Sequence, residues 1–457
     1  MSIETGLVEL EALLGDRITR AQADREAHGG SESYYALTPP DAVAYPENTK
    51  EVSEILRVCN AHGLPVIAYG AGTSLEGHTS ATHGGVCVDF SNMNRIVELR
   101  PEDMMAVVQP GLTREDLNTE LRATGLFFSV DPGANATMGG MAATRASGTT
   151  AVRYGTMRDN VLALEVVMAD GRVIRTGSGA RKSSSGYDLT SLMLGSEGTL
   201  GLITELTVKL QGQPEAVSAA VCSFERFDQA VDAVVAVIQM GIPVARIEFL
   251  DGDAVGAVNA YSGTDLPEAP HLFVEFHGSD VSAADDAARF AELVEDFGAT
   301  GIRKATKTEE RNALWKARHH AYWACLALRP GTQAVVTDVC VPISNLAQAV
   351  EETRADIAAS FIPGPILGHV GDGNFHSALL IEPGNAEELA EAKRLAARMA
   401  ERAIRLGGTI TGEHGVGMGK RHYMDAEHGE AWPVMGQIKQ ALDPNNILNP
   451  GKLVPEG

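Results

Sequence analysis

Residues 368–376 read Gly-His-Val-Gly-Asp-Gly-Asn-Phe-His and set two histidines on either side of a glycine-rich turn. Apolar residues enter this stretch at 366–367 and leave it at 378–381, so the pattern predicts a strand, a tight turn and a second strand. In that geometry the imidazoles of His369 and His376 face each other across the two strands. The hairpin therefore places two candidate metal ligands side by side.

A third candidate ligand, Glu413, lies in residues 409–417, which read Thr-Ile-Thr-Gly-Glu-His-Gly-Val-Gly. The glutamate and His414 leave an apparent strand together, and two histidines with one glutamate are a common first shell for a divalent cation with open positions. Alternatively, 371–374 is ordinary turn chemistry and the histidines are satisfied polar residues at strand ends. Because four candidate groups are concentrated in two short glycine-lined segments, the sequence favours a site for zinc, manganese or iron.

A chain of 457 residues is too long for one ordinary core, so two or three domains are expected. With 44% hydrophobic and 21% charged residues, its composition is that of a soluble globular protein. A formal net charge of −23 disfavours nucleic-acid binding and means that any anion site must carry its own local positive charge. We find no transmembrane segment and no basic leader, and expect a cytoplasmic protein, with peripheral attachment to the inner membrane as an alternative. Five scattered cysteines without a Cys-x-x-Cys pair predict buried thiols and no disulfide framework.

The chain is predicted to divide into four segments. Residues 1–34 read as helical, because their leucines form one apolar stripe before a pair of glycines. From 35 to 213, short apolar runs alternate with glycine turns and helical stretches, which is typical of an α+β or α/β domain. Residues 214–420 alternate strands and helices as in a helix-backed antiparallel sheet, and 421–457 form a C-terminal segment expected to return to the first domain.

A loop with glycines at 70, 72 and 77 follows the apolar run 66–68. Glycine permits close backbone approach and unusual dihedral angles, so such a loop can direct N–H groups at a phosphate. The nicotinamide fingerprint of a Rossmann domain needs its third glycine three places after the second, where this chain has Leu75. A Rossmann domain is therefore the weaker interpretation.

Two further segments of small residues point to a long ligand. Residues 131–140 read Asp-Pro-Gly-Ala-Asn-Ala-Thr-Met-Gly-Gly and continue to 153–155, and 195–201 read Gly-Ser-Glu-Gly-Thr-Leu-Gly. They could be ordinary tight turns. However, long segments without large side chains are better explained by a ligand that lies against backbone, and a dinucleotide is the natural candidate.

Together with Ala71-Gly72-Thr73, Arg153-Tyr154-Gly155-Thr156 and Asn449-Pro450-Gly451-Lys452, these motifs resemble the FAD-linked oxidases of the vanillyl-alcohol-oxidase type. Within that family the chain is similar to the cytochrome-type D-lactate dehydrogenases, D-2-hydroxyglutarate dehydrogenase and the flavin subunit of glycolate oxidase. The resemblance covers roughly residues 35–455 in order. It implies an α+β fold with a two-subdomain FAD-binding domain and a cap domain that contains an antiparallel ferredoxin-like sheet.

The resemblance also implies site residues. Some family members attach FAD covalently to a histidine of the first loop, but this chain has Thr73 at the corresponding place and His78 further on, so we expect non-covalent FAD. The expected cofactor-binding residues are Gly70, Ala71, Gly72, Thr73, Ser74, Gly77, Pro132, Gly133, Thr137, Gly139, Gly140, Ser147, Gly148, Tyr154, Gly155, Glu197, Gly198, Ile203 and Asn449.

The expected reaction is oxidation of a D-2-hydroxy acid to the 2-oxo acid, with hydride transfer to the flavin. A cation held by His369, His376 and Glu413 would lower the pKa of the substrate hydroxyl, and His414 is suited to accept its proton. By resemblance Arg318 pairs with the substrate carboxylate, because its guanidinium can bind both oxygens. Asn374 is a candidate substrate contact from the hairpin turn.

The substrate is expected to be D-lactate or a larger apolar D-2-hydroxy acid. In the hydroxyglutarate relatives a lysine in the strand after the Arg318 helix binds the distal carboxylate, whereas residues 334–342 contain no lysine. Tyr322 and Trp323 lie close by in the sequence. Glycolate and D-2-hydroxyglutarate remain alternative substrates of the same family.

Two other classes of function fit part of the pattern. In a metal-dependent hydrolase, the same two histidines and the glutamate would hold a cation that activates water. In a non-catalytic flavin-bearing subunit of a larger complex, a catalytic base such as His414 would not be needed. For the dehydrogenase, a cytochrome, a quinone or an electron-transfer flavoprotein would serve equally as electron acceptor. A homodimer is compatible with the sequence.

Overall fold

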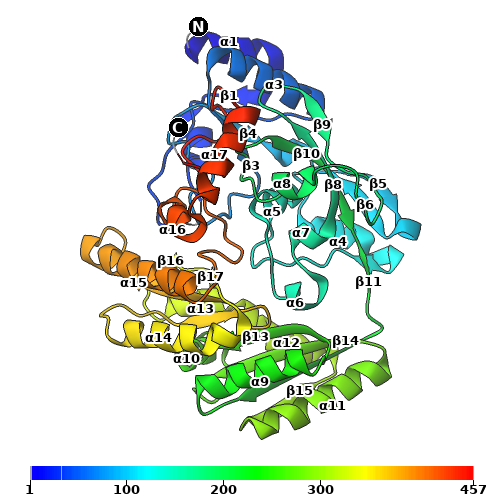
Figure 1. The fold of residues 1–457 in the computed structure, drawn as a ribbon, viewed down its shortest axis with the longest axis vertical. Coiled ribbons are helices and arrows are strands. Elements are labelled where there is room, and N and C mark those ends of the chain that lie inside the picture. Colours follow the sequence, from blue (N-terminus) through cyan, green and yellow to red (C-terminus); the bar gives the residue numbers. More distant parts are fainter. Residues whose placement is uncertain (1–2, 32, 456–457) are drawn as a thin grey trace. The chain divides into compact units, whose positions relative to one another are not determined.

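The structure is a computed structural model that describes residues 3–31 and 33–455, and the chain forms two compact units (Figure 1). The first unit contains the described residues up to Ser147, then Gly155–Gln213 and the chain from Glu413 onward. The second unit contains Gly148–Tyr154 and Pro214–Gly412. The first unit thus resumes at residue 413, earlier than the 421 expected from the sequence, and a short insert from the first half of the chain belongs to the second unit.

A small sheet with the strand order β1-β2-β4-β3 begins the first unit. Its strands are β1 (Ile18–Thr19), β2 (Ala42–Ala44), β3 (Val66–Tyr69) and β4 (Val86–Asp89). β2 and β3 run parallel to β4, as expected for strands joined by a helical crossover. That helix, α3 (Thr49–His62), is capped by the Asn48 side chain and ends at Gly63 in the left-handed conformation, with φ of 65°. Its buried side chains share one core with α1 (Ile3–Leu14).

The prediction of a single helical segment over residues 1–34 is wrong. The helix α1 ends at Leu14, and Gly15 follows with φ of 58°. Ile18 and Thr19 then pair antiparallel with Ala44 and Val43, and only α2 (Gln22–Ala27) is helical after that. β-Branched side chains favour strands, and here a distant strand edge supplies the partner that the local leucine pattern could not reveal.

A second, antiparallel sheet completes the first unit with the order β5-β6-β10-β8-β9. These strands are β5 (Ile96–Arg100), β6 (Met105–Val108), β8 (Val161–Val167), β9 (Val173–Arg175) and β10 (Leu202–Lys209), with β7 (Leu126–Phe127) and β11 (Gln211–Gly212) paired separately. Their core is shared with α4 (Arg114–Leu121), α5 (Met138–Thr144), α7 (Met157–Asn160) and α8 (Leu189–Met193). The two sheets are the two expected subdomains.

The C-terminal segment packs against the first sheet of this unit. After α16 (Met424–His428) and α17 (Ala431–Leu442), Val66 of β3 donates a backbone hydrogen bond to Ile447 and accepts one from Asn449. The remaining short elements are the 3-10 helices η1 (Gly15–Arg17), η2 (Phe90–Asn92), η3 (Pro101–Asp103), η4 (Arg122–Thr124), η5 (Ile343–Asn345) and η6 (Arg421–Tyr423). Residues 447–449 therefore lie beside the strand that leads into the first glycine loop.

The second unit is built on one large antiparallel sheet, β15-β12-β14-β13-β18-β19-β16, with β17 also paired to β19. The strands are β12 (Ala216–Ser223), β13 (Val244–Leu250), β14 (His271–Gly278), β15 (Thr300–Ala305), β16 (Gln333–Val336), β17 (Val339–Cys340), β18 (Ile366–His369) and β19 (Asn374–Ile381). The first four, with a helix after β12 and another after β14, give the order 4-1-3-2 of a ferredoxin-like sheet. This matches the expected cap fold.

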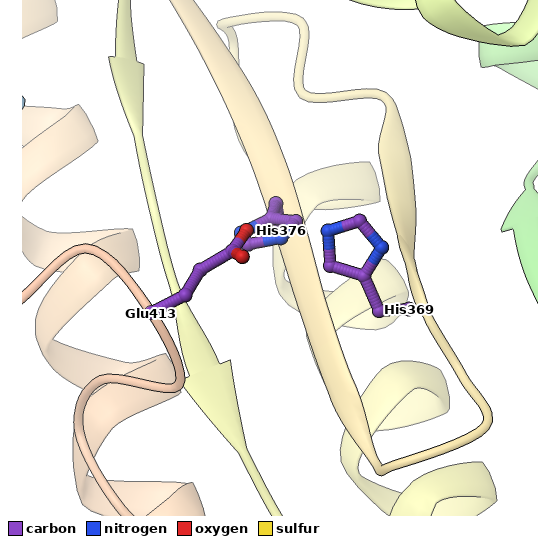
Figure 2. Close-up of side chains that lie close together, drawn as sticks. All are labelled: His369, His376 and Glu413. Atoms are coloured by element: carbon purple, nitrogen blue, oxygen red, sulfur yellow. The ribbon is translucent and has the colours of Figure 1, made fainter. Parts of the chain in front are cut away.

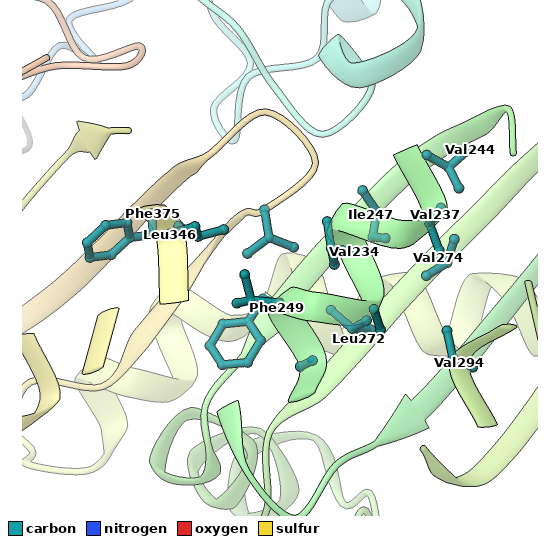
Figure 3. Close-up of a cluster of buried hydrophobic side chains, with 14 of the residues drawn as sticks. Val234, Val237, Val244, Ile247, Phe249, Leu272, Val274, Val294, Leu346 and Phe375 are labelled. Carbon is teal, nitrogen blue, oxygen red and sulfur yellow. The ribbon is translucent and has the colours of Figure 1, made fainter. Parts of the chain in front are cut away.

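Helices cover both faces of this sheet. One face packs against α9 (Phe227–Gln239), α11 (Asp280–Asp296), α14 (Leu346–Ala358) and α15 (Ala386–Arg405), and Figure 3 shows part of that core. The other face packs against α10 (Gly252–Ser262), α12 (Thr308–His319) and α13 (Ala321–Ala327). Side chains alternate along a strand, so Phe375 enters the first core, whereas Ala378 and Leu380 enter the second. His376 has the same parity as Ala378 and therefore lies on the face that α12 and α13 cover.

A buried carboxyl group caps α10 and gives the second unit a pH-dependent stability. Asp251 accepts a hydrogen bond from the backbone N–H of Ala254, and its burial raises the pKa of its carboxyl to about 7. When folding raises the pKa of an acid, the free energy of unfolding falls as the pH rises from the unfolded to the folded pKa value. For Asp251 this range is from about 4 to about 7. We expect Asp251→Asn, which retains the cap, to gain thermal stability relative to the wild type as the pH is raised from 5 to 8.

The exposed neighbour Asp253 offers a matched control, because Asp253→Asn changes the same helix end without a buried carboxyl. Differential scanning fluorimetry at several pH values measures the effect, which is of order a few kcal/mol when fully expressed. A stability difference between Asp251→Asn and the wild type that does not vary with pH would contradict the prediction.

Candidate active site

The predicted hairpin is present, and its register brings the two histidines together. His369 at the end of β18 is opposite Asn374, and Leu367 is opposite His376 on β19, so the two histidines are diagonal neighbours on one face. Their ring centroids are 5.4 Å apart with the planes at 80°. Gly373 has φ of 84°, and an added Cβ would come within 2.0 Å of the Val341 carbonyl oxygen, so only glycine fits this position of the turn.

Glu413 completes the predicted ligand set. One ligand atom from each of His369, His376 and Glu413 can be chosen so that all lie within 4.8 Å of one another, and Figure 2 shows the carboxylate directed toward the two rings. This spacing is close to the span that one cation bridges with bonds of about 2.1 Å. The expected strand at 409–411 is absent from this part of the chain, where only Thr409 pairs with Cys340 as an isolated bridge.

The outer ring nitrogens of both histidines are held by the second unit. Nδ1 of His369 lies 2.8 and 2.9 Å from the two carboxylate oxygens of Glu248, a fully buried residue of β13. Nδ1 of His376 lies 3.1 Å from the carbonyl oxygen of Thr337. Metal-binding histidines usually donate their second ring N–H to a carboxylate or a carbonyl, which fixes the ring and presents Nε2 to the metal. The residues present therefore fit a divalent cation.

Arg318 is joined to this cluster through the same carboxylate. It lies on α12, is buried, and donates from Nη2 to Oε2 of Glu248 over 2.6 Å. Its Nε–H is buried without a hydrogen-bond partner among the residues that the structure describes. A buried donor without an acceptor is costly, so an anionic ligand would complete the environment of this guanidinium.

Glu248 was not predicted from the sequence, although a signal was present. Glu248 and Arg246 are the two charged residues of the strand Val-Ala-Arg-Ile-Glu-Phe-Leu, and a buried carboxylate in such a strand is expected to have a charged or hydrogen-bonding partner, because buried charges are rarely left uncompensated. Only the long-range pairing of β13 with β18 shows that its partner is His369.

Asn374 holds the strand end in place. Its amide nitrogen donates to Oδ1 of Asp338 over 2.7 Å and to the carbonyl oxygen of Val339 over 2.8 Å, which uses both of its hydrogens. The other carboxylate oxygen of Asp338 accepts from the Thr411 hydroxyl over 2.6 Å. Asp338 thereby ties the hairpin to the segment that leads to Glu413, and both amide hydrogens of Asn374, the candidate substrate contact, are used within the protein.

We expect Glu248→Gln to weaken metal binding roughly 10- to 100-fold, the range for a lost partner of a metal-binding histidine. The amide keeps the shape of the side chain but no longer supplies a charged acceptor for His369 and Arg318. Metal content after dialysis against a chelator series, measured by mass spectrometry, tests the prediction. Glu275→Gln on the neighbouring strand is the matched control, and equal metal retention in both variants would contradict it.

The glycine loops of the first unit converge around β3. An added Cβ at Gly70 would lie 2.3 Å from the hydroxyl oxygen of Thr137, which shows that the first two predicted loops are in contact. Thr137 caps α5 by accepting from the N–H of Gly140. Gly198, with φ of 72°, lies beside Ala68 of β3, so the third loop reaches the same place. An added Cβ at Gly133 would meet open space. This arrangement of backbone and small side chains fits an extended cofactor.

Glu197 and Asn449 support these loops through their side chains. The Glu197 carboxylate accepts from the backbone N–H groups of Val416 and Gly417 over 2.7 and 2.8 Å, and His78 lies 3.3 Å from it. Burial raises the pKa of Glu197, but the charge of His78 and these hydrogen bonds lower it below the usual value overall. Asn449 donates to the carbonyl oxygens of His78 and Glu197. His78 and these backbone contacts were not predicted.

The other predicted cofactor residues are distributed over both units. The first loop contains Ala71, Gly72, Thr73, Ser74 and Gly77. Pro132 precedes α5, Gly139 lies in it and Ser147 follows it. Gly155 and Ile203 also belong to the first unit. Gly148 and Tyr154 do not: they lie in the insert that packs with the second unit, where α6 (Ala151–Tyr154) contacts β13. The Tyr154 hydroxyl is 2.8 Å from Nδ1 of His277. His414, the predicted base, is half-buried and directly follows Glu413.

Comparisons with known proteins agree with this architecture. A family model described as FAD binding domain matches residues 40–177, and one described as FAD linked oxidases, C-terminal domain, matches residues 213–453. The chain belongs to the FAD-linked oxidases. This FAD-linked oxidase is 47% identical to the probable mitochondrial D-lactate dehydrogenase of Danio rerio, over 99% of this chain and 92% of the relative. It is 44% identical to the mitochondrial D-lactate dehydrogenase [cytochrome] of Arabidopsis thaliana, over 98% of this chain and 79% of the relative.

Solved structures confirm the fold. p-Cresol methylhydroxylase with substrate bound superposes with a TM-score of 0.79 at 19% identity, over 98% of this chain and 96% of that one. Alkyldihydroxyacetonephosphate synthase gives 0.75 at 20% identity, over 98% and 86%. The FAD-linked oxidase thus has the vanillyl-alcohol-oxidase type of fold that its motifs predicted. No helix among residues 3–31 and 33–455 is long and apolar enough to cross a membrane.

Proposed function

We propose that this FAD-linked oxidase is a metal-dependent D-2-hydroxyacid dehydrogenase that oxidises D-lactate to pyruvate with non-covalently bound FAD. The assembly of His369, His376 and Glu413 beside the buried Arg318 is the observation that carries the proposal. The D-lactate dehydrogenase names of the Danio rerio and Arabidopsis thaliana relatives support the choice of substrate.

The roles of the residues follow from their chemistry. When bound, FAD accepts a hydride and a divalent cation lowers the pKa of a coordinated hydroxyl. His369, His376 and Glu413 would hold the cation, and Arg318, fixed at one end by Glu248, would donate to the substrate carboxylate. His414 takes the hydroxyl proton, since an imidazole transfers protons efficiently near neutral pH.

The substrate is small or apolar because the second unit offers no lysine for a distal carboxylate on β16 or β17. Those strands contain Gln333 to Val336 and Val339 to Cys340. Tyr322 packs against the core beside α12, whereas Trp323 is 52% exposed and contributes less to a binding pocket. Among the three expected electron acceptors, a cytochrome is favoured, since the Arabidopsis thaliana relative carries that word in its name.

Anaerobic addition of single 2-hydroxy acids to the purified protein tests the proposal. D-Lactate should bleach the flavin absorbance near 450 nm, L-lactate should not, and a chelator should abolish the bleaching while leaving the bound flavin in place. A colourless protein that hydrolyses esters would support a hydrolase instead. Faster bleaching by glycolate or D-2-hydroxyglutarate than by D-lactate would overturn the substrate assignment.

A further inference from the structure

The segment Gly148–Tyr154 is part of the flavin-binding sequence but belongs to the second unit of the fold. It lies inside the match of the FAD binding domain, residues 40–177, whereas its contacts group it with Pro214–Gly412. The chain enters this insert from Ser147 and leaves it to Gly155, both residues of the first unit. The small-residue stretch predicted to lie against a dinucleotide runs through the insert, so its conformation there depends on what holds it.

Side chains of the insert attach it to the second unit. The Tyr154 hydroxyl lies 2.8 Å from Nδ1 of His277 on β14, and Nη1 of Arg153 donates to the carbonyl oxygen of Pro243 over 3.0 Å. Val152 packs against the large core of this unit. Because Arg153 is exposed, water competes for its hydrogen bond. The half-buried Tyr154 therefore makes the stronger directional contact.

His277 is oriented by a buried carboxylate. Its Nε2 lies 2.7 Å from Oε1 of Glu275, which is two residues earlier on β14 and therefore on the same face of the sheet. Nη1 of Arg246 lies 3.4 Å from the same oxygen. Burial raises the pKa of Glu275, but the hydrogen bond from His277 and the charge of Arg246 bring it below the usual value overall. The ionised carboxylate accepts from Nε2–H, and in the neutral imidazole Nδ1 is then the acceptor for the Tyr154 hydroxyl.

The stability of the sheet does not account for this polar pair. Glu275 and His277 are only 5% and 8% exposed, and their neighbours on β14 are mostly apolar. Burying a carboxylate costs free energy, and well-packed apolar side chains of similar volume often stabilise a fold equally well or better. Neither residue is one of the three predicted metal ligands. The pair is better explained by what it holds, which is Tyr154.

We propose that His277 and Glu275 are positioning residues for FAD binding. Glu275 orients the imidazole of His277, the imidazole holds the Tyr154 hydroxyl, and Tyr154 fixes the insert in the conformation that binds the cofactor. A hydroxyl engaged by His277 acts as an anchor, so the insert contributes to the cofactor site through its backbone, beginning at Gly148. The inference rests on the proposed non-covalent binding of FAD and is independent of the metal and the substrate.

The affinity of flavin-free protein for FAD tests the proposal in Tyr154→Phe, His277→Leu and the double variant. Kd is measured by titration with FAD, followed by the quenching of flavin fluorescence. When fewer molecules hold the insert in the binding conformation, the apparent affinity falls by that fraction. We expect each single variant to raise Kd roughly 3- to 10-fold, the factor for one net hydrogen bond. The double variant should bind no more weakly than the weaker single variant, because both substitutions remove the same contact.

Tyr261→Phe is the matched control, because Tyr261 is an exposed residue of α10 in the same unit. It should leave Kd unchanged, and all the variants should keep their metal content, since none of these residues is a predicted ligand. Melting temperatures of the flavin-free proteins separate positioning from packing. A role in packing alone would lower the melting temperature without raising Kd and would overturn the proposal, as would fully additive losses in the double variant.

Acid precipitation of the wild-type protein distinguishes a failure of this inference from a failure of the proposed function. Flavin that is released into the supernatant agrees with non-covalent binding, and an unchanged Kd in Tyr154→Phe and His277→Leu would then overturn the positioning role alone. Flavin that stays with the precipitated protein would overturn both the non-covalent binding and the inference that rests on it.

Discussion

His376→Ala is expected to lower kcat/KM for D-lactate by roughly 10³-fold or more and to yield protein without a stoichiometric divalent metal. The imidazole is one of three predicted ligands, and a cation with two remaining ligands binds too weakly to stay with the protein. Lewis-acid polarisation of a substrate oxygen contributes several kcal/mol to catalysis, which sets the size of the loss. Metal analysis, flavin absorbance and steady-state kinetics on the same preparation measure the three quantities.

The flavin separates a local effect from misfolding. The predicted cofactor loops lie largely in the first unit, whereas His376 belongs to β19 of the second, so the variant should keep its FAD. His428→Ala removes a histidine from α16 in the first unit and should retain both metal and activity. Full metal content with unimpaired turnover in His376→Ala would refute the metal site.

The hairpin was predictable because its information is local. Alternating apolar residues and a Gly-Asp-Gly turn specify two antiparallel strands, and a period of two then puts His369 and His376 on one face. The glycine-rich motifs, taken in their order along the chain, likewise predicted the fold, because they resemble those of the FAD-linked oxidases. By contrast, the spacing of the motifs does not show that Gly70 touches Thr137, which lies 67 positions later in the chain.

The parts that the sequence could not reveal depend on distant partners. Residues 334–342 read as one strand, but the structure ends β16 at Val336 and starts β17 at Val339, and between them the Asp338 side chain accepts hydrogen bonds from Asn374 and Thr411. These donors lie 36 and 73 positions further along the chain. Glu248 is a similar case, because it meets His369 at a sequence separation of 121. A buried carboxylate can be recognised in a sequence, whereas its partner requires the sheet order.

His414→Gln should separate proton transfer from metal binding. Because His414 directly follows Glu413 but is not one of the three predicted ligands, the variant should keep its metal and its flavin while kcat falls about 10²- to 10⁴-fold, the range for loss of a general base. Glutamine retains hydrogen-bonding capacity but cannot accept the hydroxyl proton. Rapid anaerobic mixing with D-lactate isolates flavin reduction from reoxidation, and the loss should appear in the reductive step.

The two variants together identify which group does which task. A His414→Gln protein that loses metal as completely as His376→Ala would make His414 a ligand, and the base would have to be sought elsewhere. If flavin reduction in the variant is instead as fast as in the wild type, the side chain of residue 414 does not limit the reaction, and proton removal must be assigned to another group or to water. Only a slow reductive step with full metal occupancy agrees with a base that acts beside an intact cation site.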